Sequence, residues 1–165
     1  MYSASRTRIL RQKATPGRPT TENLGRLVLV VEDDPDIQSL VAEHLLNVGF
    51  DVCLASTGEI AMQMIRDRLP GVVCLDLNLP RISGYDVCEQ IRADLAIKDI
   101  SILITSARRS LDVRVFAVEA GADAYLTKPY GMNQLTDEIE RLFELRVRDQ
   151  SEASAGAESK VTRTG

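Results

Sequence analysis

The sequence predicts an α/β protein in which one parallel sheet carries helices on both faces. Three observations lead to this prediction. Short apolar runs alternate with longer segments whose apolar residues recur at helical spacing, and five such pairs follow one another. The runs at 27–31 and 72–75 are apolar throughout, as buried strands are. Charged residues follow these runs directly. Strict alternation of strand and helix favours a doubly wound parallel sheet.

The expected elements are bounded by polar, glycine or proline residues. The strands are predicted at 27–31, 51–55, 72–75, 100–104 and 124–127. The helices are predicted from Pro35 to Gly49, at 57–68, from Ser83-Gly84 to about Asp94, at about 109–120 and at 132–147.

Local signals mark where several helices begin. Asp34 can cap the first helix, and Pro35 suits its first turn. The buried stripe of that helix is predicted to contain Ile37, Leu40, Val41, Leu45 and Val48. The segment 56–59 reads Ser-Thr-Gly-Glu, which predicts a capping box ahead of the second helix.

Length and composition narrow the class of protein. A chain of 165 residues with 44% hydrophobic and 27% charged residues is typical of one globular domain. Its apolar runs are far shorter than the ~20 residues of a membrane-spanning helix. The three cysteines are Cys53, Cys74 and Cys88, an odd number without a CxxC motif. We therefore expect buried thiols in a cytoplasmic protein without membrane partners.

The charge is distributed unevenly along the chain. Residues 1–25 carry five basic residues and one acidic residue, and we expect them to form a disordered basic arm. Residues 26–147 are expected to form the domain, and 148–165 a flexible tail. Between residues 26 and 146 there are 12 basic and 20 acidic residues. This acidic net charge argues against nucleic-acid binding by the predicted domain.

The predicted strand ends carry the candidate functional residues. Glu32 and Asp33 follow the first strand, Asp76 closes the third, and Lys128 follows the fifth. Strand ends of an open α/β sheet lie side by side, where ligands bind. Carboxylates brought together repel one another, so this arrangement favours a site for a divalent cation.

Together these motifs resemble a known family. Further matching segments are Thr105-Ser106, Lys128-Pro129, Gly121-Ala122-Asp123 and Tyr125. In this order and at this spacing, the motifs resemble the receiver domain of two-component response regulators over about residues 26–146. The resemblance implies a five-stranded, flavodoxin-like sheet of strand order 2-1-3-4-5.

The resemblance also implies a phosphorylation site. By it, Asp76 is the phospho-acceptor, taking a phosphoryl group from a sensor histidine kinase or a histidine phosphotransfer protein. Mg²⁺ is the implied cofactor. Its implied ligands are Asp33, Glu32, Asp76 and the backbone carbonyl of Asn78.

A second set of residues is implied to respond to the phosphoryl group. Lys128 would pair with a phosphoryl oxygen, aimed inward by a cis peptide bond to Pro129. Thr105 would hydrogen-bond the phosphoryl group, and Tyr125 would turn inward as Thr105 moves. This motion would change the face formed by the fourth helix, fifth strand and fifth helix.

Two other classes of protein are alternatives to a phosphorylated receiver. A haloacid-dehalogenase-type phosphatase would need an acid two residues after Asp76, where this chain has Asn78. A receiver that only binds, without phosphorylation, would not need the acidic pair with Asp76 and Lys128. We therefore expect no enzyme acting on external substrates, only a protein that catalyses its own phosphorylation and dephosphorylation.

The expected output follows from what the chain contains after the last predicted helix. With only a short polar segment beyond residue 147, we expect a stand-alone regulator without direct DNA binding. It would control a target protein through its switch face or pass phosphate along a relay. The formation of a homodimer is left open, but not of the type usual for winged-helix regulators. Ala124 and Glu138 depart from the charge pattern by which those regulators dimerise, and Arg114 and Gln134 keep only part of it.

Overall fold

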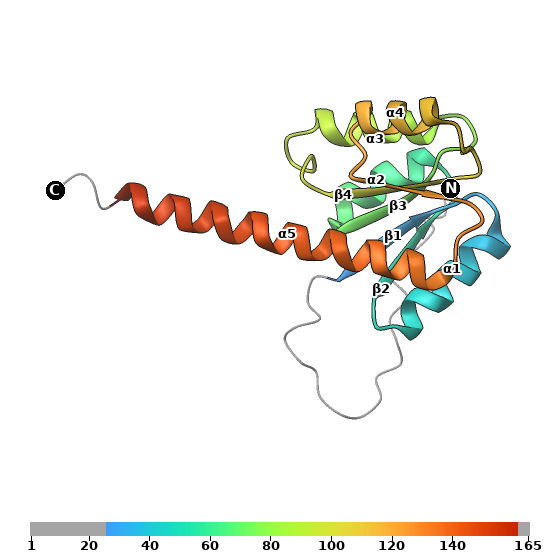
Figure 1. The fold of residues 1–165 in the computed structure, drawn as a ribbon. Coiled ribbons are helices and arrows are strands. Elements are labelled where there is room, and N and C mark those ends of the chain that lie inside the picture. Colours follow the sequence, from blue (N-terminus) through green and yellow to red (C-terminus); the bar gives the residue numbers. More distant parts are fainter. Residues whose placement is uncertain (1–25, 162–165) are drawn as a thin grey trace, which may run out of the picture.

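The structure is a computed structural model that describes residues 26–161, and the expected arm 1–25 lies outside the described residues (Figure 1). Its sheet has five parallel strands in the order β2-β1-β3-β4-β5, which confirms the predicted fold class. The strands are β1 Leu27–Val31, β2 Asp51–Ala55, β3 Val72–Asp76, β4 Ser101–Ser106 and β5 Ala124–Thr127.

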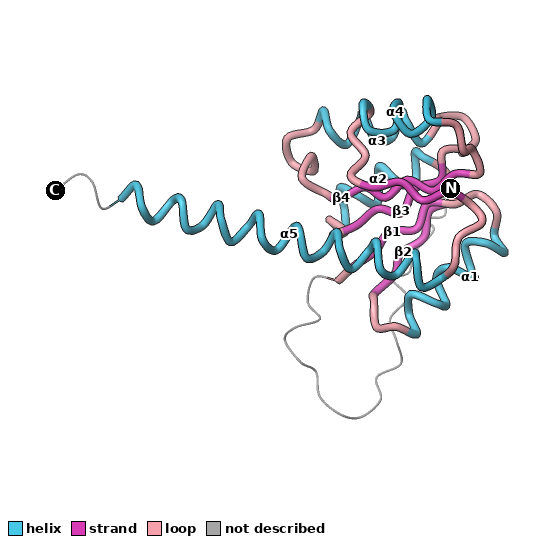
Figure 2. Tube along the Cα trace, in the orientation of Figure 1, coloured by secondary structure: helices cyan, strands magenta, loops and turns pink. Residues whose placement is uncertain are grey.

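Helices cover both faces of this sheet (Figure 2). The helices are α1 Pro35–Asn47, α2 Gly58–Arg68, α3 Gly84–Ala93, α4 Leu111–Glu119 and α5 Met132–Val161. Helices α1 and α5 pack on one face in a core that includes Leu45 and Ile139. Helices α2, α3 and α4 pack on the other face around Ile65 and Ile91. Strand β3 is buried along its whole length between these two cores, which explains its unbroken apolar run.

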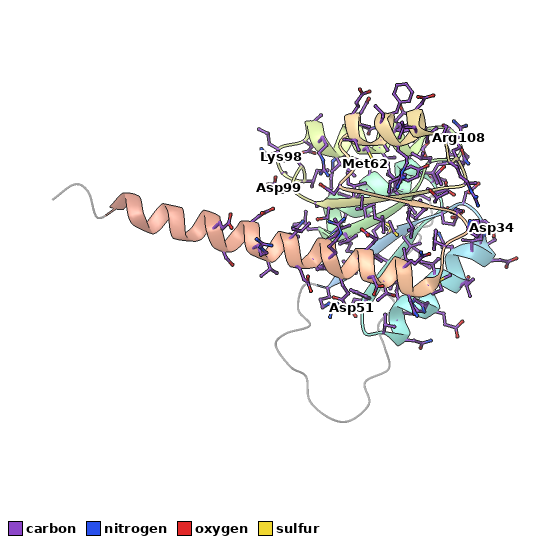
Figure 3. All side chains as sticks on the ribbon, in the orientation of Figure 1. Asp34, Asp51, Met62, Lys98, Asp99 and Arg108 are labelled. Atoms are coloured by element: carbon purple, nitrogen blue, oxygen red, sulfur yellow. The ribbon has the colours of Figure 1, made fainter. Side chains whose placement is uncertain are left out.

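All strands point the same way, so their carboxyl ends share one edge of the sheet. In Figure 3, Asp34 and Arg108, which follow β1 and β4, lie at one end of the domain. Lys98 and Asp99, which precede β4, lie at the opposite end. The residues after each strand therefore converge on one edge, as the parallel sheet requires.

The helix caps are largely those that the sequence predicts. Asp34 caps α1, and its Oδ1 accepts hydrogen bonds from the backbone N–H groups of Asp36 and Ile37. The predicted box at 56–59 is wrong in detail. Thr57 caps α2 by accepting a hydrogen bond from Ile60 N, so Glu59 falls one position short of completing a box.

The predicted buried stripe of α1 is too broad. Val41 and Leu45 are buried together with Ala42, whereas the side chain of Leu40 is 56% exposed. Ile37 and Val48 are exposed as well. The helix lies against a narrow arc of the sheet, so apolar residues beside that arc remain in solvent.

Helix α5 is longer than the sequence predicts. It was expected to end at residue 147, and residues 148–161 were assigned to a flexible tail, but the structure continues the helix to Val161 (Figure 1). The extension contains three alanines, two glutamates and one lysine, which have high helix propensity, and Gly156 is its only glycine. In the part of the chain that the structure describes, no helix is both long and apolar enough to cross a membrane.

Candidate functional site

Three carboxylates meet at the carboxyl edge of the sheet. Glu32 and Asp33 follow β1, and Asp76 is the last residue of the neighbouring strand β3. One ligand oxygen from each of the three lies within 4.8 Å of the others. Glu32 and Asp76 are buried, whereas Asp33 is exposed. Hard oxygen ligands with one side open to solvent fit Mg²⁺, which keeps several waters in its shell.

Lys128 joins two of these carboxylates. Its Nζ donates hydrogen bonds to Glu32 Oε2 and to Asp76 Oδ2, each over 2.7 Å. The residue follows β5, and its backbone N–H donates to Ser106 O at the end of β4. The Lys128–Pro129 peptide bond is cis. The ammonium group thus lies inside the acidic cluster.

Burial and charge oppose one another in this cluster. Burial raises the pKa of Glu32, and the nearby Asp76 carboxylate raises it further, which together outweigh the effect of Lys128. Burial alone would lower the pKa of Lys128. The hydrogen bonds and charges of Asp76 and Glu32 more than offset that effect, so the pKa of Lys128 lies above its ordinary value. The lysine therefore stays charged. A further positive charge near Glu32 would favour the ionised form of its carboxylate.

Backbone contacts hold Asp76 in place. Its Oδ1 accepts a hydrogen bond from Asn78 N over 2.9 Å, and Leu77 N donates to Thr105 O. In the pairing of β3 with β4, Thr105 lies directly beside Asp76, and both are buried. The predicted residues Asp76, Thr105 and Lys128 are thus brought together. Asn78 is exposed at the rim of the site.

Tyr125 lies outside the acidic cluster. Its hydroxyl donates a hydrogen bond to Arg108 O, in the β4–α4 loop, over 2.7 Å. The guanidinium carbon of Arg114 on α4 lies 5.5 Å from the centre of the Tyr125 ring. Tyr125 therefore contacts both the loop that follows Thr105 and the helix after it.

Sequence reasoning missed one residue that supports the site. Gln38, one turn into α1, donates hydrogen bonds from Nε2 to Glu32 O over 2.9 Å and to Ala55 O over 3.0 Å. A glutamine on a helix carries no sequence signal for such a role, because its acceptors belong to two strands whose adjacency only the fold reveals.

The cysteines are placed as expected. Cys53, Cys74 and Cys88 are free and buried. Burial raises the pKa of Cys53 to about 11 and the pKa values of Cys74 and Cys88 to about 12. Such thiols are protonated at neutral pH, so thiolate chemistry plays no part in this site.

The fold and the site together define a class of protein. A doubly wound sheet with three carboxylates and a lysine at its strand ends is an α/β domain built around an acidic, cation-compatible site. The family model of the response regulator receiver domain matches residues 28–140. The chain therefore belongs to the response regulator receiver domain family.

Known relatives support this assignment. The response regulator MprA of Mycolicibacterium vanbaalenii is 35% identical over 135 residues, covering 82% of this chain and 56% of the relative. The DNA-binding dual master transcriptional regulator RpaA of Synechocystis sp. is 32% identical over 116 residues, covering 70% and 48%. The crystal structure of the response regulator DrrB, a Thermotoga maritima OmpR/PhoB homologue, is similar with a TM-score of 0.65 and 30% identity, covering 73% of this chain and 53% of DrrB.

These relatives correct one expectation. The chain spans about half the length of the curated relatives it matches. Those relatives include transcriptional regulators, one of them named as DNA-binding. The expectation of no direct DNA binding, which rested on the short segment after the last predicted helix, is therefore wrong. The sequence of a receiver alone does not predict which output it controls.

Proposed function

We propose that this domain is a phosphorylation-activated receiver with Asp76 as its phospho-acceptor. The observation that carries the proposal is the position of Asp76, whose carboxylate accepts a hydrogen bond from the Lys128 ammonium and lies beside the carboxylates of Glu32 and Asp33. A carboxylate attacks phosphorus effectively only where positive charge neutralises the phosphoryl oxygens. This edge of the sheet offers one such charge and the ligands for a second.

The transfer forms one bond and breaks one. An Asp76 carboxylate oxygen attacks the phosphorus of a phospho-histidine on a sensor kinase or a histidine phosphotransfer protein. The O–P bond of an acyl phosphate forms, the P–N bond breaks, and the electron pair stays on the imidazole nitrogen. Mg²⁺, held by Glu32, Asp33, Asp76 and the carbonyl of Asn78, supplies charge neutralisation when bound.

Lys128 and Thr105 act on the transferred group. Lys128 now donates to both Glu32 and Asp76, so it can turn one N–H toward a phosphoryl oxygen without losing its place. Thr105 lies beside Asp76 in the sheet and supplies a hydroxyl donor there. Asn78, the second residue after Asp76, has no acidic proton to give, so the domain stores the phosphoryl group and is not a phosphatase of external substrates.

The output arises at the face formed by α4, β5 and α5. Movement of Thr105 toward the phosphoryl group would disturb the β4–α4 loop, whose Arg108 carbonyl holds the Tyr125 hydroxyl. Tyr125 and α4 would then rearrange together. By likeness to the transcriptional regulator RpaA, we propose that this rearrangement controls transcription.

Phosphoryl labelling tests the proposal. Incubation with ³²P-acetyl phosphate and Mg²⁺ should label the wild type, EDTA should abolish the label, and Asp76→Asn should remove it. Asp67→Asn, an exposed aspartate on α2, is the matched control and should label normally. Equal labelling of Asp76→Asn and wild type would contradict the proposal, as would sustained release of phosphate from a phosphomonoester.

A further inference from the structure

The turn that carries Glu32 and Asp33 is held by a side chain outside the acidic cluster. The pairing of β1 with β2 extends one step past the strands, since Glu32 N donates to Ala55 O over 3.1 Å. Beyond that point the chain leaves the sheet and enters α1. The carbonyl oxygen of Glu32 therefore lies past the end of the hydrogen-bond ladder between β1 and β2.

Gln38 supplies the missing donor. Its Nε2 donates to Glu32 O over 2.9 Å and to Ala55 O over 3.0 Å. Both acceptors are carbonyl oxygens, so the amide can take only one orientation, with its nitrogen facing the strand ends. Both N–H bonds of the amide are used, and the half-buried side chain ties α1 to the ends of two neighbouring strands.

The two hydrogen bonds of Gln38 act together with others in the turn that carries Glu32 and Asp33. From Glu32 to Gln38 the chain is also held by Asp34 N, which donates to Glu32 Oε1 over 3.3 Å, and by Gln38 N, which donates to Asp34 O over 2.9 Å. The Gln38 side chain joins the two ends of this segment. The backbone that carries Glu32 and Asp33 is thereby held in place before any cation arrives.

We propose that Gln38 is a positioning residue for the divalent-cation site. Its side chain donates to backbone carbonyls of Glu32 and Ala55, and it acts by fixing the backbone that presents Glu32 and Asp33. Outer partners of this kind typically change metal affinity by about 10- to 100-fold when they are removed. The inference rests on the proposed function, because the cation belongs to that function.

Mn²⁺ binding tests the inference without relying on phosphorylation. Gln38→Met removes the donor while keeping the length and helix propensity of the side chain. Free Mn²⁺ is measured by electron paramagnetic resonance during titration of the protein. We expect a dissociation constant about tenfold higher than that of the wild type, and an unfolding midpoint in EDTA within a few degrees of it. Gln63→Met makes the same change at an exposed position on α2 and should bind Mn²⁺ as the wild type does.

A second measurement separates positioning from general damage. The Mg²⁺ concentration that half-saturates acetyl phosphate labelling should rise about tenfold in Gln38→Met, while the rate at saturating Mg²⁺ stays within twofold. A Mn²⁺ affinity within twofold of the wild type would overturn the inference and leave the proposed function standing. A loss of rate that saturating Mg²⁺ does not restore would also overturn it. A wild type that binds no Mn²⁺ would overturn the proposed function, and the inference with it.

Discussion

Gly84, the first residue of α3, lies directly against the backbone of Asp76. A methyl group added at Gly84 would lie 2.5 Å from the Asp76 carbonyl oxygen and 2.9 Å from the Cα of Leu77. The Gly84 N–H also donates to Leu77 O over 3.2 Å. The start of α3 therefore packs against the strand end that carries Asp76, the proposed phospho-acceptor, and only glycine permits this approach.

Gly84→Ala should destabilise the domain by about 2–4 kcal/mol, because the methyl group meets backbone atoms that cannot rotate aside. Gly58→Ala is the matched control. The three atoms nearest to its methyl group would belong to the side chains of Ile82 and Val87, at 2.4 to 2.8 Å, and side chains can adjust. We expect Gly58→Ala to cost less than half as much in urea unfolding. Equal costs at the two positions would contradict the role given to the Asp76 backbone.

Lys128→Met should destabilise the metal-free domain by about 2 kcal/mol at neutral pH. The substitution leaves Glu32 and Asp76 facing each other with side chains only 7% exposed and no cation between them. The cost stays below that of a fully buried pair because Lys128 is itself 20% exposed. Urea unfolding in EDTA measures it.

Mg²⁺ gives the same variant a distinctive signature. A divalent cation replaces the missing charge, so Mg²⁺ should raise the unfolding free energy of Lys128→Met by more than it raises that of the wild type. Acetyl phosphate labelling should nevertheless fall, since no ammonium faces the phosphoryl group. A variant that Mg²⁺ stabilises less than the wild type would argue against competition between Lys128 and the cation.

Glu32→Gln should stabilise the metal-free domain at pH values above the folded-state pKa of Glu32. The pKa of Glu32 is raised in the folded state, mainly by burial, so its protonated form favours folding. The contribution of Glu32 to the free energy of unfolding is fully present below its pKa in the unfolded state. It is lost as the pH rises through its pKa in the folded state. Above the folded pKa the wild type lacks this contribution, whereas the neutral amide of Gln has no charge to desolvate at any pH.

The pH dependence of Glu32→Gln gives a check on the sign. As the pH falls toward 4, Glu32 of the wild type takes up its proton, and the stability difference between the two proteins should shrink. Urea unfolding in EDTA at several pH values measures this. A difference that grows on acidification would mean that Lys128 lowers the Glu32 pKa by more than burial raises it.

The sequence predicts the strands and their order of appearance well, because buried strands and amphipathic helices leave distinct periodicities. It also places Glu32, Asp33, Asp76 and Lys128 at or just after the ends of predicted strands. In a parallel sheet, that position alone brings such residues to one edge.

Contacts that depend on tertiary neighbours escape the sequence. Gln38 acts on Ala55, which lies on a different strand, so no local pattern reveals the contact. Leu40 has the spacing of a core residue but lies beside the covered arc of α1. The extension of α5 beyond residue 147 follows from helix propensity, which its polar composition concealed.

Leu111→Glu should separate the output of the domain from its stability. Leu111, at the start of α4, is 74% exposed, and of the α4 residues only Ala117 is buried. The substitution should therefore change the unfolding free energy by less than about 0.5 kcal/mol and leave acetyl phosphate labelling intact. Beryllofluoride-treated wild type is expected to capture partner proteins that Asp76→Asn does not capture. Leu111→Glu should abolish their capture, because it replaces an apolar contact by a charge on the face formed by α4, β5 and α5. Leu95→Glu is the matched control: Leu95 is 81% exposed in the α3–β4 segment, outside α4, and its substitution should leave capture unchanged. Full capture by Leu111→Glu, or equal loss in both variants, would place the activated contact elsewhere than on α4.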